Sequence, residues 1–200
     1  MVADLSVSRR FVLRTGAAAL AALALAACEK APAFHSTDVS GSDLGTDLSL
    51  TDFNGQPRTL QDFKGKVLVV FFGFVQCPDV CPTALADLTQ VKAQLGADAD
   101  RLQVVFVTVD PERDTPEILR EYVTQFDPSF LGLRGDADAT ARVAKSYRVF
   151  YAKVPGKEPG SYTMDHTAGI YIYDPQGRLR LFARHNSGVE ALASDIKQLM

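Results

Sequence analysis

The chain has 200 residues, of which 46% are hydrophobic and 22% are charged, and its formal net charge is −3 at pH 7. This length and composition are typical of one globular domain of ordinary size. Residues 1–27 carry a local charge of +2, so the remainder carries −3 minus 2, or −5. An acidic body argues against nonspecific binding of nucleic acid, which requires a basic face. We expect no nucleic-acid partner.

Residues 1–27 are predicted to be an export signal. Arg9 and Arg10 precede an apolar run of small residues, 16–27. A basic flank, a short apolar stretch and small residues at its end are typical of bacterial export signals, and the arginine pair resembles the twin-arginine type. The alternative is an uncleaved membrane helix. Twelve residues would span about 18 Å as a helix, which is well short of the roughly 30 Å bilayer core.

Residues 28–47 are predicted to be a lipidated, flexible tether. The sequence Leu-Ala-Ala-Cys ending at Cys28 resembles a lipoprotein box, in which that cysteine becomes the lipidated first residue. The segment that follows is polar and rich in Ser, Gly and Asp, as flexible linkers are. These features predict a membrane-anchored lipoprotein on the periplasmic side of a bacterial cell envelope. The folded domain is then residues 48–200.

The pattern of residues 48–200 predicts an α/β domain. Expected strands and helices alternate before the chain closes with an antiparallel strand pair and a helix. The expected strands are 48–52 and 58–60 around an Asn-Gly turn, 66–74, 102–109, a short strand or turn at 130–133, 167–173 and 178–183. The expected helices are 83–95, 115–126, 136–147 and 188–200. This order indicates a thioredoxin-like mixed sheet flanked by helices on both faces.

Two cysteines lie where the first long apolar strand turns into a helix. Cys77 and Cys81 occur in the sequence Cys-Pro-Asp-Val-Cys-Pro, four residues apart. At that spacing the second cysteine lies one helical turn beyond the first, over the same face. Backbone amides and the helix dipole favour anions at a helix N-terminus, so they assist thiolate formation. The two sulfurs could therefore pair as a disulfide or hold one metal ion.

His166 could complete a metal site with these thiols. It lies in Tyr-Thr-Met-Asp-His-Thr, just before another apolar strand. Two thiolates and an imidazole form a soft, three-coordinate ligand set that selects Cu(I), whereas structural zinc prefers four protein ligands. Asp165 could orient the imidazole ring by accepting its N–H, or could instead cap the loop. A histidine without such neighbours would be read as an ordinary surface or core residue.

One acidic segment lies at the end of the second buried strand. Residues 110–117, Asp-Pro-Glu-Arg-Asp-Thr-Pro-Glu, contain four carboxylates. Helix capping by Asp114 or Thr115 accounts for most of them. Asp110 directly follows the strand, and chemistry in open α/β sheets collects at the carboxyl ends of strands. We therefore expect it to support the site.

Four stretches together resemble the Sco (SenC-type) copper-chaperone family. They are the Phe-Phe-Gly-Phe strand with the Cys-Pro-Asp-Val-Cys-Pro loop, 109–116, the region of Phe150 and Tyr151, and Asp-His-Thr at 165–167. The resemblance covers roughly residues 48–200. It implies a thioredoxin-like fold and copper, as Cu(I) and in some states Cu(II), bound by Cys77, Cys81 and His166. It also implies delivery to the binuclear copper centre of cytochrome c oxidase subunit II.

Two functions stay open at this point. The first is a copper carrier with little or no turnover chemistry. The second is a membrane-tethered thiol-disulfide oxidoreductase of the cell envelope, in which Cys77 and Cys81 are the redox pair that prepares the thiols of the acceptor. The partners expected in either case are the oxidase subunit, envelope thiol reductants and other copper carriers.

Overall fold

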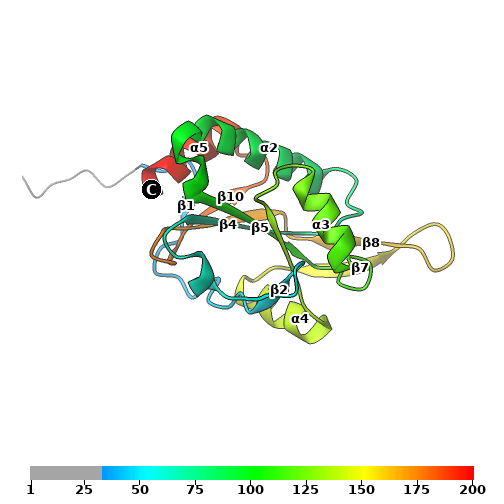
Figure 1. Cartoon of the computed structure of the whole chain (residues 1–200). Helices are drawn as coiled ribbons and strands as arrows, with labels where there is room; N and C mark the ends of the chain where they lie inside the picture. The colour runs from blue at the N-terminus through cyan, green and yellow to red at the C-terminus, as the bar shows by residue number, and fades with distance from the viewer. Residues whose placement is uncertain (1–32) are drawn as a thin grey trace, which may run out of the picture. The chain divides into compact units, whose positions relative to one another are not determined.

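A computed structural model of the protein describes residues 33–200 (Figure 1). The predicted export signal and Cys28 lie outside this range. Within the described part of the chain, every helix is too short or too polar to cross a bilayer.

The central feature is an eight-stranded mixed sheet. Its strands, in spatial order, are β1 (Thr37–Asp38), β10 (Leu179–Arg184), β9 (Gly169–Tyr173), β4 (Val67–Gly73), β5 (Leu102–Thr108), β6 (Leu131–Arg134), β2 (Leu50–Asp52) and β3 (Pro57–Arg58). Strands β4, β5 and β6 are parallel, and every other pairing is antiparallel. This arrangement confirms the predicted mixed sheet.

Helices cover both faces of that sheet. They are α2 (Val80–Leu95), α3 (Pro116–Thr124), α4 (Ala137–Ser146) and α5 (Val189–Leu199), with short 3₁₀ helices η1 (Leu60–Phe63) and η2 (Gly96–Arg101). In Figure 1, α2, α3 and α5 lie on one side of the strands and α4 lies on the other. Aromatic pairs hold the two layers, Phe106 of β5 against Tyr122 of α3 and Phe72 of β4 against Tyr147 beside α4. The three-layer fold class is therefore confirmed.

The continuous apolar runs of the sequence form the strands covered on both faces. All seven residues of β4 and all five of β9 are buried. Such strands need no alternation, since each side chain meets a helix layer on one face or the other. Two helix starts also agree with the sequence, because the side chains of Thr115 and Asp136 accept hydrogen bonds from Ile118 N–H and Ala139 N–H.

Packing against the domain begins earlier than the predicted boundary at residue 48. Strand β1 pairs with β10 through Thr37 and Asp38. The buried carboxylate of Asp195 accepts hydrogen bonds from the backbone amides of His35 and Ser36, at 2.8 and 2.7 Å. Composition alone suggested a tether there, but backbone pairing and a buried acceptor hold this polar segment in place.

A second, two-stranded sheet was not predicted. Strands β7 (Tyr151–Pro155) and β8 (Tyr162–His166) pair with each other as an antiparallel hairpin. Three of the five residues of β7 are exposed, so the strand lacks the apolar alternation that marks a half-buried strand. We call β7 and β8 the His166 hairpin, because its last residue is the predicted metal ligand.

Candidate metal centre

The two cysteines lie at the junction of β4 and α2. Residues 74–79, here called the thiol loop, connect Gly73 to the start of the helix and contain Cys77, while Cys81 lies in the first helical turn. The backbone N–H of Cys81 donates to the Sγ of Cys77 at 3.4 Å. The side chain of Cys81 is fully buried, whereas Cys77 is half-buried. Both are free cysteines in this structure.

Gly73 provides the space for the buried sulfur. A Cβ atom at this position would lie 2.7 Å from Cys81 Sγ and 2.8 Å from the Phe106 ring. Real Cβ atoms do not approach other heavy atoms so closely, so any larger residue would displace the sulfur or the ring. The glycine of the Phe-Gly-Phe sequence at the end of β4 therefore makes room for the cysteine in the first turn of α2.

The two thiols have unequal acidities. A hydrogen bond from Cys81, helped by the backbone amides of Asp79 and Cys81, lowers the pKa of Cys77 to about 5. The same contact and burial raise the pKa of Cys81. The geometry therefore favours a thiolate at the accessible cysteine and a proton on the buried one in the metal-free protein.

His166 faces the buried thiol from the end of β8. Its Nε2 lies 3.6 Å from Cys81 Sγ, and its Nδ1 lies 3.2 Å from the carbonyl oxygen of Thr167. If Nδ1–H donates to that carbonyl, the lone pair of Nε2 is directed at the sulfur pair. The rings of Phe71 and Phe74 meet the imidazole edge-on, with centroids at 6.4 and 5.8 Å. The ring is therefore fixed on several sides.

These three side chains form a group that could hold one metal ion. The two sulfurs and a ring nitrogen all lie within 4.8 Å of one another. Among residues 33–200 this group contains no fourth histidine, cysteine or carboxylate. Two thiolates and one imidazole suit a soft ion in a three-coordinate site, whereas a structural zinc site would be closed by a fourth protein ligand.

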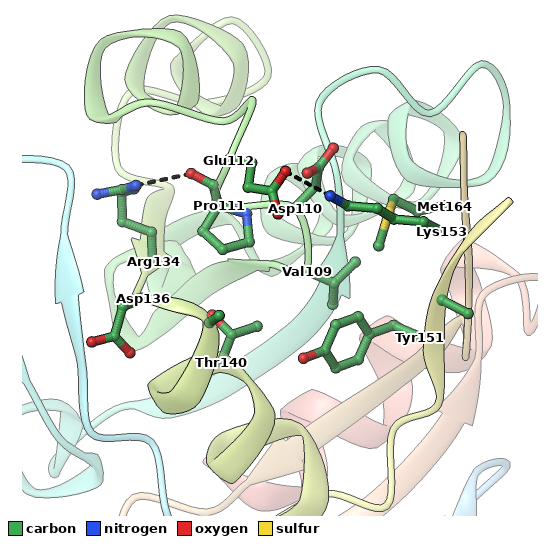
Figure 2. Close-up of a pocket in the computed structure, with 13 residues that line it drawn as sticks. Val109, Asp110, Pro111, Glu112, Arg134, Asp136, Thr140, Tyr151, Lys153 and Met164 are labelled. Atoms are coloured by element: carbon green, nitrogen blue, oxygen red, sulfur yellow. Dashed lines mark hydrogen bonds and ion pairs between the residues drawn. The ribbon is translucent and has the colours of Figure 1, made fainter. Parts of the chain in front are cut away.

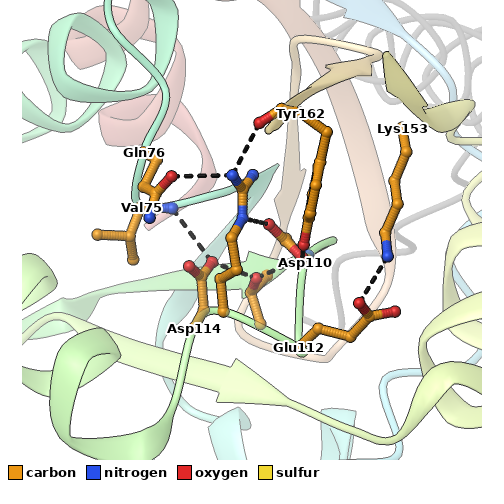
Figure 3. A network of polar contacts seen from close by, with 9 residues as sticks. Val75, Gln76, Asp110, Glu112, Asp114, Lys153 and Tyr162 are labelled. Carbon is orange, nitrogen blue, oxygen red and sulfur yellow. Dashed lines mark hydrogen bonds and ion pairs between the residues drawn. The ribbon is translucent and has the colours of Figure 1, made fainter. Parts of the chain in front are cut away.

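A polar network lies beside the group (Figure 3). The guanidinium of Arg113 donates to the Asp110 carboxylate, and at 2.8 Å to both the Gln76 side chain and the backbone carbonyl of Tyr162. The hydroxyl of Tyr162 donates to the same carboxylate at 3.0 Å. We call Gln76, Asp110, Arg113 and Tyr162 the Arg113 network. It joins the thiol loop, the loop after β5 and the His166 hairpin.

A second carboxylate supports the thiol loop directly. Asp114 is buried and accepts hydrogen bonds from the Thr108 hydroxyl at 2.5 Å and from the Val75 amide at 3.1 Å. Burial is the main cause that raises its pKa. Helix capping was the expected role of this residue or of Thr115; the structure gives the cap to Thr115 and places Asp114 under the thiol loop.

The two predicted supporting residues, Asp110 and Asp165, lie in different environments. Asp110 lies where expected, at the end of β5, and is buried next to the site. Asp165 is exposed and pairs across the hairpin with Ala152, and the carbonyl of Thr167 takes the expected position beside Nδ1. Of the two roles open for Asp165, orienting the ring or capping the loop, the group placed to fill the first is the Thr167 carbonyl, because neighbouring side chains on a strand point to opposite faces.

Sequence reasoning missed Arg113 and Tyr162. Both were present in the segments singled out, the acidic run and the segment around His166, but neither carried a metal-ligand pattern. The spacing of Asp110 and Arg113, three residues apart, was the available signal for an ion pair. The contact with Tyr162 could not be read from spacing, since 49 positions separate it from the arginine.

A cavity of about 270 Å³ lies beside the network (Figure 2). Asp110 and Met164 line it together with Tyr151 and Thr140, whose buried hydroxyl has no hydrogen-bond partner among the described residues. None of the three metal-ligand candidates lines this cavity. It is therefore separate from the metal centre.

Comparison with known proteins assigns the family. The family model SCO1/SenC matches residues 36–200. The chain belongs to this family. The mouse mitochondrial SCO2 homologue is 39% identical over 154 residues, which are 76% of this chain and 60% of the mouse protein. The chain thus matches about three fifths of the length of that relative.

Two solved members of the SCO1/SenC family are similar over most of the described residues. Bradyrhizobium japonicum ScoI, solved with copper bound, is 44% identical with a TM-score of 0.72, covering 78% of this chain and 99% of that chain. The apo Sco1 protein of Thermus thermophilus is 37% identical with a TM-score of 0.75, covering 86% of this chain and 99% of the other. Membership therefore rests on sequence and on fold.

Proposed function

We propose that the protein binds copper through Cys77, Cys81 and His166. The observation that supports this most directly is the convergence of their three ligand atoms within 4.8 Å, although 85 positions separate the histidine from the second cysteine. The donor set is the soft type that Cu(I) prefers, and a relative at 44% identity was solved with copper bound. Copper is here the cargo of the protein.

We further propose that the copper is delivered to the binuclear centre of cytochrome c oxidase subunit II. The Sco family is a family of cytochrome c oxidase assembly proteins. Three protein ligands leave the ion open to an incoming donor, and the half-buried Cys77 gives an acceptor thiolate a side from which to approach. Transfer then proceeds by ligand exchange, in which an acceptor thiolate binds the ion as a thiolate of this chain leaves it.

The proposed location is the periplasmic side of a bacterial cell envelope. The export signal of residues 1–27 and lipidation of Cys28 support it from the sequence. A SCO1/SenC family protein of Bacillus anthracis, 25% identical to this chain with a TM-score of 0.69, is a lipoprotein. Labelling the expressed chain with a fatty acid, with Cys28→Ser as the control, tests the anchor.

Copper content of the purified, reduced protein tests the binding site. We expect one copper ion per chain in the wild type and almost none in Cys77→Ala or Cys81→Ala. His166→Ala should retain copper with lower affinity, because the two thiolates remain. His185, which lies outside the ligand group, provides the matched histidine control in His185→Ala. Equal copper content in the wild type and the Cys77→Ala variant would refute the proposal.

A thiol-disulfide oxidoreductase is the second candidate. The observation in its favour is one accessible cysteine backed by a buried one. The Cys77 thiolate would attack a disulfide of the target and release one target thiolate. The Cys81 thiolate would then attack Cys77 Sγ, release the second target thiolate and leave a disulfide that an envelope thiol reductant must reduce.

The two candidates separate in a strain that lacks the protein. If copper delivery is the role, added copper should restore oxidase activity, and His166→Ala should complement poorly. A pure reductase should be replaced by added thiol reductant, and His166→Ala should complement fully. Measuring oxidase activity under these three conditions, added copper, added thiol reductant and complementation with His166→Ala, assigns the role.

A further inference from the structure

Arg113 connects the two halves of the proposed metal site. Its Nη1 atom donates to Gln76 of the thiol loop and to the Tyr162 carbonyl of the His166 hairpin, both at 2.8 Å. Its Nε atom donates to Asp110, which is fixed at the end of β5. Arg113 therefore bridges the thiol loop, the end of β5 and the hairpin strand, through the three partners Gln76, Asp110 and Tyr162 that Figure 3 labels.

The guanidinium is also enclosed by aromatic rings. It lies 3.8 Å from the ring centroid of Tyr162 and 6.0 Å from that of Phe74, which in turn packs on the imidazole of His166. Its Nη2 atom is buried with no hydrogen-bond partner among the described residues. Leaving a buried donor unpaired is costly, so the surrounding contacts must hold the side chain in this position.

The contacts of Arg113 act on the strand that carries the third ligand. Tyr162, Met164 and His166 alternate with exposed residues on β8, so their side chains share the face of the strand directed at the domain. The other polar tie of the hairpin in Figure 3, Lys153 to Glu112, is solvent-exposed. Exposed ion pairs contribute little. The Arg113 network is therefore the main polar anchor of the hairpin.

We propose that Arg113 is a positioning residue that holds the His166 ring over the two thiols. This inference rests on the proposed copper-binding function and names the residue that pre-organises its third ligand. Without the network, β8 remains paired to β7 but moves relative to the thiol loop. The metal then loses the imidazole more often, whereas the two thiolates stay where β4 and α2 place them.

The first test measures Cu(I) affinity by competition with a chromogenic chelator. Arg113→Lys keeps a positive charge beside Asp110 but loses the planar fork that reaches Gln76 and the Tyr162 carbonyl. We expect roughly tenfold weaker binding, the lower end of the effect of removing a partner that orients a metal ligand. Arg120→Lys is the matched control, since Arg120 also contacts an aromatic ring and a carbonyl, those of Phe53.

A double-mutant cycle shows whether the effect passes through the imidazole. In a His166→Ala background, Arg113→Lys should change the affinity by less than twofold, because the group that it positions is gone. The same tenfold loss in both backgrounds would overturn the proposal, since Arg113 would then act on the thiols or on folding. An unchanged affinity for Arg113→Lys in the wild-type background would overturn it equally.

A second test needs no metal. In the NMR spectrum of the reduced, metal-free protein, contacts between the His166 and Phe74 ring protons report the ring position. We expect Arg113→Lys and Tyr162→Leu to weaken these contacts, and Tyr162→Phe to keep most of them because its ring remains under the guanidinium. Contacts of full strength in Arg113→Lys would refute the positioning role.

The two proposals can fail separately. If His166→Ala binds Cu(I) as tightly as the wild type, the three-ligand proposal is wrong, and the ring contacts still decide whether Arg113 positions the histidine. If Arg113→Lys fails to fold, the ring contacts between His166 and Phe74 are compared in Tyr162→Leu and Tyr162→Phe instead. These variants change the residue that Arg113 contacts and leave the arginine in place.

Discussion

The thiol loop and the His166 hairpin contribute to one site but are built in different ways. Cys81 is fully buried in the first turn of a 16-residue helix that packs on the central sheet, and its sulfur fills the space left by Gly73. His166 ends a five-residue strand of a separate two-stranded sheet. The first region takes its shape from the core, and the second depends on a few side-chain contacts.

Because of this difference in packing, the two sulfurs and the imidazole have different physical roles. A pair of sulfurs held by the core is pre-organised, so little conformational entropy is lost when a metal binds. An imidazole on a peripheral hairpin can move away at lower cost, because few buried contacts must be broken. The proposed carrier role needs both properties, since a carrier must bind its cargo and also release it to an acceptor.

The largest expected effect concerns the acidity of the accessible thiol. Titration of thiolate absorbance in the metal-free wild type should show Cys77 ionising with a pKa of about 5, against an ordinary value near 9. A lowered pKa means that the thiolate stabilises the fold fully above pH 9 and that this contribution is lost as the pH falls through 5. The free energy of unfolding of the wild type, relative to Cys77→Ser, should therefore decrease from pH 9 to pH 5.

The same titration includes an internal control. In Cys81→Ser the hydroxyl still donates to Cys77, so the pKa of Cys77 should stay low, whereas Cys81→Ala removes the hydrogen bond that lowers this pKa most and should raise it. A pKa in Cys81→Ala equal to that of the wild type would contradict the account given for the thiol loop.

The next effect tests how tightly the core holds the buried sulfur. Gly73→Ala places a Cβ atom against Cys81 Sγ and the Phe106 ring, and should destabilise the fold by about 1–3 kcal/mol, as overpacking does. Gly132→Ala is the matched control, because its Cβ would lie 2.5 Å from the Leu119 side chain, away from the ligands. Urea unfolding should show similar losses in both, and only Gly73→Ala should also weaken copper binding.

A smaller effect is expected where the hairpin begins. The Thr167 hydroxyl accepts the Phe150 amide at 3.1 Å, and the Thr167 amide donates to the Phe150 carbonyl at 2.9 Å. Thr167→Val removes the first bond and should cost about 1 kcal/mol, the usual net value of one hydrogen bond. Thr167→Ser keeps the acceptor and should be nearly neutral in thermal unfolding. A loss in Thr167→Ser as large as in Thr167→Val would exclude the hydroxyl as the cause.

The smallest effect is expected at the exposed pair of Lys153 and Glu112. Both side chains are largely in solvent, so Lys153→Met should leave the unfolding midpoint and the copper affinity almost unchanged. Arg113→Lys provides the contrast, because it changes the partly buried anchor of the same hairpin. If Lys153→Met weakened copper binding as much as Arg113→Lys, the assignment of the main anchor would be wrong.

Much of the fold was predictable because its signals are local. The apolar run at 66–74 became the fully buried strand β4, and the Asn-Gly pair became the turn between β2 and β3, with Gly55 at a positive φ. Asp136 caps a helix as its position suggested. The strand, the turn and the helix cap each depend on residues only a few positions apart. Over that distance the spacing of apolar side chains and the residue types of a turn decide the local structure.

The His166 hairpin was not predictable in the same way. Strand β7 contains a Lys and a Pro, and three of its five residues are exposed. Its sequence therefore shows neither the alternation nor the apolar run that marks a strand. Strand β1 is only two residues long and exists because β10 offers an edge. In both cases backbone pairing with a partner, rather than local preference, makes the strand.

The sequence by itself determined which donor groups this protein has: two thiols at a strand-to-helix junction and one distant imidazole, a set that suits a soft metal ion. Only the tertiary structure decided which groups hold that imidazole. It placed the Thr167 carbonyl rather than the Asp165 side chain beside the ring, and it brought Gln76, Arg113 and Tyr162 together. Donor chemistry belongs to the side chain alone, whereas orientation depends on contacts between segments far apart in the chain.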